Sequence, residues 1–179
     1  MLLEKLIEAD LPNESSTLIA TDLSFEIMAK DRLKFKKRFP DKSLVYIACD
    51  ATNLPFADDV ADVTVSFFGI LNMFGLIEKG IAEAARVTAS SGTLFNTFLD
   101  IKEDSEGFKR VIEVCKEYDM AGTENMFLFD HIKGVHEKYF PKLETITVVE
   151  SIYENDDNVQ DLLPYRGEWF AYRIFAGRK

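Results

Sequence analysis

Short apolar runs of strand length alternate with segments of helical periodicity over most of this chain, and that alternation constrains the fold more than any other feature. The apolar runs lie at residues 17–21, 43–49, 62–70 and 93–99, and the helical patterns lie at residues 24–38, 76–87 and 105–118. Strand and helix in turn are typical of a mostly parallel sheet joined by right-handed crossovers. Because the strands are apolar throughout, we also expect both faces of the sheet to be covered.

The two ends of the chain depart from this alternation. Residues 2–7 carry leucine and isoleucine at helical spacing, so the chain is expected to open with a helix. Near the other end, residues 143–153 and 168–175 alternate in the manner of strands and are predicted to form an antiparallel pair at the sheet edge. Ser24 is the expected N-cap of the second helix, and Ser91-Gly92 is an expected turn before the fourth strand. The predicted fold class is therefore α/β.

The composition indicates one acidic globular domain spanning residues 1–179. The chain has 31 Asp and Glu against 21 Lys and Arg, a formal net charge of -10, and 47% hydrophobic residues, enough for a single core. No apolar run reaches the roughly 20 residues of a membrane span, and the charged start does not look like a secretory leader, so we expect a cytoplasmic protein. A negative surface repels phosphate backbones, and no nucleic-acid partner is expected.

One stretch runs against the acidic charge, and few residues suit a metal. Residues 30–42 contain seven of the basic side chains, which we interpret as the solvated side of a helix. The cysteines, Cys49 and Cys115, are far apart in the sequence, and the histidines are His131 and His136. No zinc site can be assembled from this set, so no metal is expected and the cysteines are interpreted as buried, reduced thiols.

Carboxylates follow two consecutive predicted strands. Asp22 follows the first and Asp50 the second, and in open α/β sheets ligands bind beyond the carboxyl ends of the strands. Asp22 could accept hydrogen bonds from the vicinal hydroxyls of a ribose there, or it could only help to cap the next helix. Asp50 and the N–H of Ala51 could read the amine and ring nitrogen of an adenine, or they could simply form a turn.

Five blocks of the sequence follow one another in a characteristic order. They are Leu18 to Ser24 with its acidic strand end, Cys49 to Phe56 with Asp-Ala and Leu-Pro-Phe, Asp62 to Phe68, Glu83 to Leu94, and the closing run Trp169 to Lys179. Together they resemble the class I S-adenosylmethionine-dependent methyltransferases, especially the group of ubiquinone and menaquinone biosynthesis. The resemblance covers nearly the whole chain and implies a Rossmann-like methyltransferase sheet.

The resemblance also implies S-adenosylmethionine as cofactor and methyl transfer as the activity. The residues that would contact the cofactor are Asp22 and Leu23 at the ribose, Asp50 and Ala51 at the adenine, and Ser66 and Phe67 near the sulfonium. The acceptor is expected to be a small apolar or aromatic molecule, because the segments 120–140 and 153–165 that would roof its pocket contain many Phe, Met and Tyr. His131 is the candidate general base, its alternative being an ordinary surface histidine.

One feature of the family is missing from this sequence. Members begin with a strand and a glycine-rich loop, whereas the first glycine here is Gly69 and Met1 stands where the loop should end. The missing strand would lie between the strands that end at Asp22 and Ser66, leaving a slot of about 10 Å. Three explanations stay open: an abbreviated or partial form of a longer enzyme, a degenerate member without catalysis, and a homodimer in which a second copy completes the sheet.

Two other functions compete with methyl transfer. A non-catalytic binding protein of the same fold is favoured by the missing glycines and opposed by the retained Asp22 and Asp50. A nicotinamide-dependent enzyme also places an acid after its second strand, but the sequence lacks G-x-G-x-x-G, so this alternative ranks last.

Overall fold

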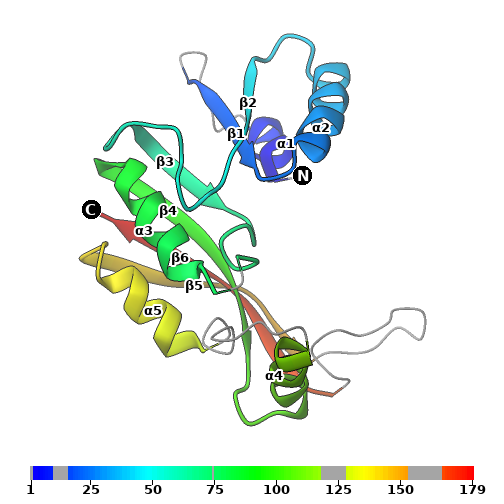
Figure 1. The fold of residues 1–179 in the computed structure, drawn as a ribbon, viewed down its shortest axis with the longest axis vertical. Coiled ribbons are helices and arrows are strands. Elements are labelled where there is room, and N and C mark those ends of the chain that lie inside the picture. Colours follow the sequence, from blue (N-terminus) through cyan, green and yellow to red (C-terminus); the bar gives the residue numbers. More distant parts are fainter. Residues whose placement is uncertain (1, 10–15, 74, 118–127, 153–166) are drawn as a thin grey trace. The chain divides into compact units, whose positions relative to one another are not determined.

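A computed structural model describes residues 2–9, 16–73, 75–117, 128–152 and 167–179, and the strands in it form two separate sheets (Figure 1). By its contacts the chain divides into two compact units, Met1–Pro55 and Phe56–Lys179. The first unit contains α1 (Leu2–Glu8), β1 (Leu18–Asp22), α2 (Phe25–Arg38) and β2 (Leu44–Ala48). The second unit contains β3 (Ala61–Ser66), α3 (Ile77–Val87), β4 (Thr88–Ile101), α4 (Glu106–Glu117), α5 (Phe129–Glu137), β5 (Lys142–Ile152) and β6 (Trp169–Arg178).

The first unit is a parallel pair of strands with a helix packed against it. β1 and β2 pair in register from Leu18 opposite Leu44 onward. Ser24 caps α2 as predicted, because its Oγ accepts a hydrogen bond from the N–H of Ile27 at 3.3 Å. The helix ends at Arg38, with Phe39 as its C-cap before a proline that could not continue the helix.

α2 contributes few side chains to the interior of the first unit. Of its side chains only Met28 and Phe35 are buried. The Phe35 ring lies 5.3 Å from the ring of Phe39 and 6.4 Å from that of Tyr46 on β2, centroid to centroid. On the polar side, Arg38 forms ion pairs with Glu4 and Glu8 of α1, which joins the two helices.

The second unit contains a four-stranded sheet in the order β3-β4-β6-β5. β3 and β4 are parallel, while β6 is antiparallel to both β4 and β5. The predicted antiparallel pair near the C-terminus is therefore confirmed, with β5 as the edge strand. Within the described parts of the chain, no helix has the length and apolar character of a membrane-crossing segment.

One face of this sheet carries the core. Leu94 and Phe98 on β4 and Phe175 on β6 are fully buried, and α3 and α5 lie side by side over them (Figure 1). Gly177 on β6 lies so close to the ring of Phe140 that a Cβ there would be 2.6 Å from Cγ of the phenylalanine. Close packing of this kind fixes the strands against the two helices.

The expectation that both faces of the sheet are covered is wrong. Val63 and Val65 on β3 point away from the core and are exposed, as are Ile19 on β1 and Val45 on β2. In the first unit the reason is local, since the chain after β2 folds into turns up to Pro55 and supplies no helix for the second face. The apolar character of the strands therefore predicted more burial of their side chains than the structure shows.

Two boundaries also differ from the sequence prediction. The expected turn at Ser91-Gly92 lies inside β4, because α3 passes directly into that strand at Thr88. The register between β3 and β4 shifts there, and a Cβ on Gly92 would lie 2.8 Å from the carbonyl oxygen of Ala61. Gly92 therefore permits an irregularity in the pairing of β3 and β4, in place of the turn that the sequence predicted. The segment 120–140, for which the sequence predicted no helix, contains α5.

Candidate functional site

The carboxyl ends of β1 and β2 lie next to each other in the first unit. The strands pair up to Asp22 opposite Ala48, and the N–H of Cys49 then donates to the carbonyl of Asp22 at 2.9 Å. Asp22 and Asp50 therefore begin the two loops that leave the same end of a parallel pair. This is the position at which α/β sheets bind ligands.

Asp22 takes part in the turn before α2 with one oxygen and leaves the other free. Its Oδ1 accepts a hydrogen bond from the N–H of Ser24 at 2.8 Å, while Oδ2 has no hydrogen-bond partner among the described residues. The side chain is exposed, and the neighbouring Leu23 is 80% exposed. The sequence left helix capping and ligand binding as alternatives for Asp22. One carboxylate can serve both, because each role uses a different oxygen.

Asp50 organises the second loop in a similar way. Its Oδ1 accepts from both the N–H and the hydroxyl of Thr52, each at 2.8 Å. The N–H of Ala51 donates no hydrogen bond within the described chain and remains available to an acceptor. Cys49 is half-buried rather than fully buried as predicted. This partial burial, and secondarily the charge of Asp50, raises the pKa of its thiol and favours the protonated form.

β3 ends earlier than predicted, and the cause is a strained residue at its carboxyl end. The strand stops at Ser66, and Phe68 has a φ of 57°, which is rare for a bulky side chain. Thr97 on β4 holds the reversal, since its Oγ1 accepts from the N–H of Phe68 at 2.7 Å and donates to the carbonyl of Ser66 at 3.2 Å. The Ser66 Oγ accepts from the N–H of Ile70. Such strain often accompanies functional sites.

The reversal exposes Phe67 at the end of a row of aromatic rings. The Phe67 side chain is 60% exposed, and its ring centroid lies 4.9 Å from that of Phe68. Phe68 in turn contacts Tyr172 at 5.7 Å, and Tyr172 contacts Phe170 at 5.5 Å, centroid to centroid. An exposed ring at a strand end is suited to contact an apolar or cationic group.

The two histidines lie in different environments on α5. His131, the predicted base, is half-buried, and its Nε2 lies 3.3 Å from a carboxylate oxygen of Glu78 on α3. His136, by contrast, is fully buried. Its Nδ1 bonds to the carbonyl of Ile132 and its Nε2 to the amide of Asn96, and burial lowers its pKa to about 4. The described residues contain no cluster of three metal-binding side chains.

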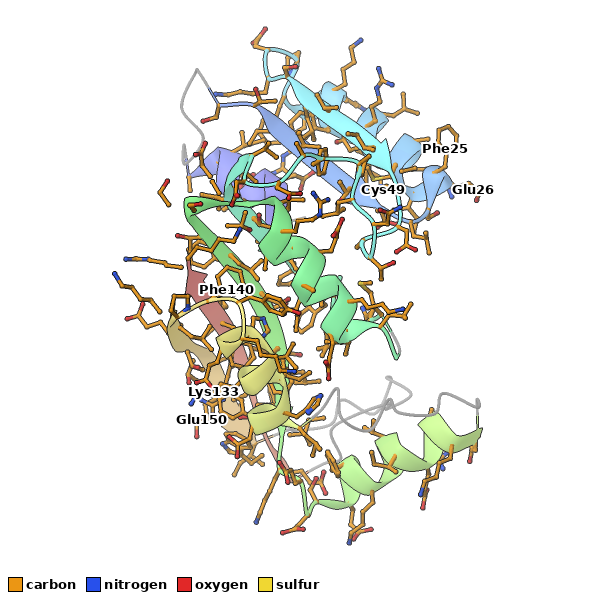
Figure 2. The ribbon with its side chains drawn as sticks, turned by 60° about the vertical axis from the view of Figure 1, so that its left-hand side comes forward. Phe25, Glu26, Cys49, Lys133, Phe140 and Glu150 are labelled. Atoms are coloured by element: carbon orange, nitrogen blue, oxygen red, sulfur yellow. The ribbon has the colours of Figure 1, made fainter. Side chains whose placement is uncertain are left out.

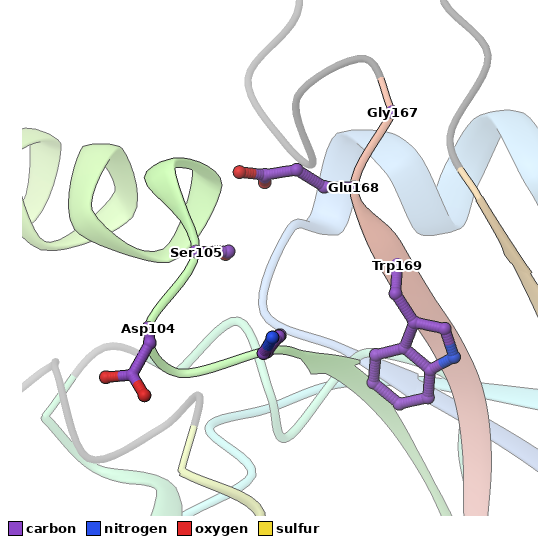
Figure 3. Close-up of a pocket in the computed structure, with 6 residues that line it drawn as sticks. Asp104, Ser105, Gly167, Glu168 and Trp169 are labelled. Carbon is purple, nitrogen blue, oxygen red and sulfur yellow. The ribbon is translucent and has the colours of Figure 1, made fainter.

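A hollow of about 320 Å³ opens in the second unit beyond the carboxyl end of β4 (Figure 3). Its walls come from the turn into α4 and from the start of β6, and they are Lys102, Asp104, Ser105, Gly167, Glu168 and Trp169. Both carboxylate oxygens of Glu168 accept from the N–H of Gly107, so they occupy the N-terminus of α4. The predicted roofing segments fall largely outside the described residues, at 118–127 and 153–166.

Comparison with known proteins identifies the family. A family model described as a methyltransferase domain matches residues 6–96, which include both loops after β1 and β2 and all of β3. The chain belongs to the methyltransferase domain family. This confirms the resemblance drawn from the five sequence blocks. Over 86 residues the chain is 36% identical to a demethylmenaquinone methyltransferase of Beutenbergia cavernae, a match that covers 48% of this chain and 33% of that protein. The matched part therefore spans about a third of the length of this curated relative.

Solved structures of methyltransferases share the fold. An arsenic(III) S-adenosylmethionine methyltransferase from Chlamydomonas reinhardtii matches with a TM-score of 0.66 at 14% identity, over 98% of this chain and 60% of that chain. A geranyl diphosphate methyltransferase, solved in complex with S-adenosylmethionine, matches with a TM-score of 0.65 at 11% identity, over 97% of this chain and 72% of that chain. The Rossmann-like methyltransferase fold predicted from the sequence is confirmed.

Sequence reasoning missed the residues that hold the predicted ones in place. Thr97 and Glu168 act on segments 29 and 61 positions away in the chain, and Asn96 meets His136 across 40 positions. Because the partners lie far apart in the sequence, no short sequence pattern could have predicted these pairs. The Ser-Phe-Phe-Gly sequence at the end of β3 offered a weak hint, since a glycine often follows a strand that turns sharply.

Proposed function

We propose that the protein binds S-adenosylmethionine and transfers its methyl group to a small apolar or aromatic acceptor. The observation that carries the proposal is the pair of carboxylates, Asp22 and Asp50, at the carboxyl ends of two adjacent parallel strands within one unit. Membership of the methyltransferase domain family supports it, because the matched residues include both carboxylates.

The free polar groups of the first unit suit the nucleoside part of this cofactor. Oδ2 of Asp22 is an unoccupied acceptor for the ribose hydroxyls, and its other oxygen is anchored by Ser24, which fixes the direction of the carboxylate. The N–H of Ala51 can donate to a ring nitrogen of adenine, while Asp50 can accept from the exocyclic amine. Leu23, exposed beside Asp22, offers an apolar surface next to the ribose.

S-Adenosylmethionine supplies a methyl group bound to a positively charged sulfur, and the transfer is an in-line displacement without a covalent enzyme intermediate. The protein has to align donor and acceptor and to exclude water. We assign Phe67 and Ser66 to the sulfonium end, where an aromatic ring can stabilise the positive charge. Thr97 would keep both residues in position by holding the turn that follows them.

For the acceptor we propose the hollow beside Trp169 in the second unit. The indole forms one wall, and its N–H is bonded to Glu150 at 2.8 Å, which fixes the ring for stacking against a flat apolar molecule. His131 is kept as the candidate general base for acceptors that have to lose a proton, although it is not one of the residues that line this hollow. Glu78 beside it would orient the imidazole.

Calorimetric titration with S-adenosylhomocysteine tests the ribose assignment. Asp22→Ala removes two charge-assisted hydrogen bonds and should weaken binding about 10- to 100-fold. Asp41→Ala is the matched control, since it removes the same charge from another exposed position of the first unit and should leave affinity unchanged. Equal affinity of Asp22→Ala and the wild type would show that the assignment is wrong.

A further inference from the structure

α2 has a positive charge that the proposed methyl transfer does not use. Residues 25–42 contain seven Lys and Arg against three Asp and Glu, in a chain that is otherwise strongly acidic. Arg38 is paired with Glu4 and Glu8. By contrast, Lys30, Lys34, Lys36 and Lys37 form no ion pair with any carboxylate in the described part of the chain. The charge is thus displayed to solvent rather than neutralised within the fold.

Three of the unpaired lysines surround a leucine that is also exposed. Lys30, Lys36 and Lys37 lie three or four positions from Leu33, so they are its neighbours on the helix surface. Leu33 is 73% exposed, on the side of α2 opposite to the buried Met28 and Phe35. Phe25, labelled at the first turn of α2 in Figure 2, is 74% exposed.

A solvated structural helix does not need this combination. The packing of α2 requires only its buried stripe. Polar residues in place of the exposed leucine and phenylalanine would leave that packing unchanged. A basic helix with a few exposed large apolar residues is typical of segments that lie on a membrane surface, where lysines meet lipid phosphates and apolar side chains enter the interface. A nucleic-acid backbone would use the lysines but would leave Leu33 and Phe25 without a role.

We propose that the outer face of α2, made of Lys30, Leu33, Lys34, Lys36 and Lys37 with Phe25 at its end, docks on an anionic lipid bilayer. The net charge of -10 does not oppose this docking, because charges that lie more than a Debye length of about 8 Å from the bilayer are screened. The 14 residues of α2 extend over about 21 Å, so the helix is long enough to present a local basic surface on this scale. Glu26 is the acidic residue on this face, and it lies in the first turn. The docking is independent of the proposed methyl transfer.

Co-sedimentation with lipid vesicles tests the proposal on the full chain. We expect binding to vesicles of phosphatidylcholine with about a third phosphatidylserine, none to pure phosphatidylcholine, and a loss of binding as the salt concentration rises. The triple variant Lys30→Gln, Lys34→Gln, Lys37→Gln should bind about 100-fold more weakly, since each lysine near an anionic surface contributes about fivefold. Leu33→Gln should weaken binding at every salt concentration at which the wild type still binds.

The matched control separates the position of the charge from its amount. The triple variant Lys79→Gln, Lys116→Gln, Lys142→Gln removes the same charge from exposed positions of the second unit and should bind within about fivefold of the wild type. Circular dichroism verifies that both triple variants are folded. The proposal is overturned if the wild type ignores anionic vesicles or if the two triple variants bind equally. It is also overturned if a duplex DNA competes the protein off the vesicles while Leu33→Gln has no effect.

Discussion

The two units of the molecule differ in how they are stabilised. The second unit has a contiguous core in which Leu94, Phe98, Phe140 and Phe175 are fully buried between the sheet and its helices. Among the described residues of the first unit, the buried apolar side chains are Ile7, Met28 and Phe35. A two-stranded sheet with so small a core is marginal by itself.

The groups proposed to bind the nucleoside part of the cofactor lie in the less stabilised unit, whereas Ser66 and Phe67, assigned to the sulfonium end, belong to the second unit. The groups with free hydrogen-bonding capacity, Oδ2 of Asp22 and the N–H of Ala51, lie in the weakly stabilised first unit. The second unit instead contains strained and tightly bonded features, such as Phe68 held by Thr97. A unit of low stability gains proportionally more from a bound ligand, so the first unit should respond to the cofactor more strongly than the second.

The largest expected effect comes from emptying the core of the second unit. Phe98→Ala should lower its unfolding free energy by about 3 to 5 kcal/mol, because a buried ring is lost and a cavity remains. Trp169, the single tryptophan, lies in β6 and reports this unit in a urea titration followed by fluorescence. Phe35→Ala in the first unit is the control and should leave the urea midpoint of the Trp169 fluorescence transition unchanged. Equal shifts would contradict independent stabilisation of the two units.

Acid should destabilise the second unit through His136. Burial lowers the folded pKa to about 4, whereas the unfolded imidazole takes up its proton near pH 6.5, so the unfolded state binds more protons between these values. Stability is fully present above pH 6.5 and falls by about 3 kcal/mol as the pH drops to about 4.

The Trp169 urea midpoint, measured from pH 7 to pH 4, checks this dependence. His136→Gln should remove most of the dependence of this midpoint on pH, while His131→Gln, at the half-buried position, should retain the dependence. A slope unchanged by His136→Gln would assign the acid sensitivity to other groups.

A smaller effect should follow from releasing the turn after β3. Thr97→Val leaves the N–H of Phe68 without its partner, at an expected cost of about 1 to 3 kcal/mol. Thr97→Ser keeps the hydroxyl and should retain most of the stability. Thermal denaturation of the two variants provides the comparison. A loss of stability in Thr97→Ser with none in Thr97→Val would show that the methyl group rather than the hydroxyl matters.

The smallest effect is expected in the first unit, at the cap of α2. Ser24→Ala removes the hydrogen bond to Ile27 and should cost about 1 kcal/mol. Hydrogen exchange should then become faster in the amides of α2, while those of β4 keep their protection. Unchanged exchange in α2 would mean that the cap does not limit opening of this unit.

Local sequence signals predicted the first unit well. Ser24 after a short apolar strand predicted the start of α2, and the helical pattern over residues 24–38 predicted its end. The place of Asp22 and Asp50 at the ends of two strands was predicted because a carboxylate directly after a strand is visible in the sequence itself. These features depend on neighbours within a few positions, and their physical causes, capping and turn formation, act over the same range.

Features set by distant residues were not predicted. Residues 67–70 continue the apolar pattern of β3, but Thr97 on the neighbouring strand holds Phe68 out of strand conformation. His136 is polar in sequence, yet Asn96 and the carbonyl of Ile132 satisfy both ring nitrogens and permit full burial. Conversely, Val63 and Val65 are apolar and exposed, because apolar character favours burial but does not supply the helix that would cover them.

Titration of the chain with S-adenosylhomocysteine, by calorimetry and by thermal shift, tests the central claim most directly. The account predicts saturable binding of one ligand per chain, with about 2.7 kcal/mol of added stability at 100 times Kd and increased hydrogen-exchange protection at the loops after β1 and β2. A folded chain that binds no S-adenosylhomocysteine, or one in which Asp22→Ala binds as tightly as the wild type, would contradict it.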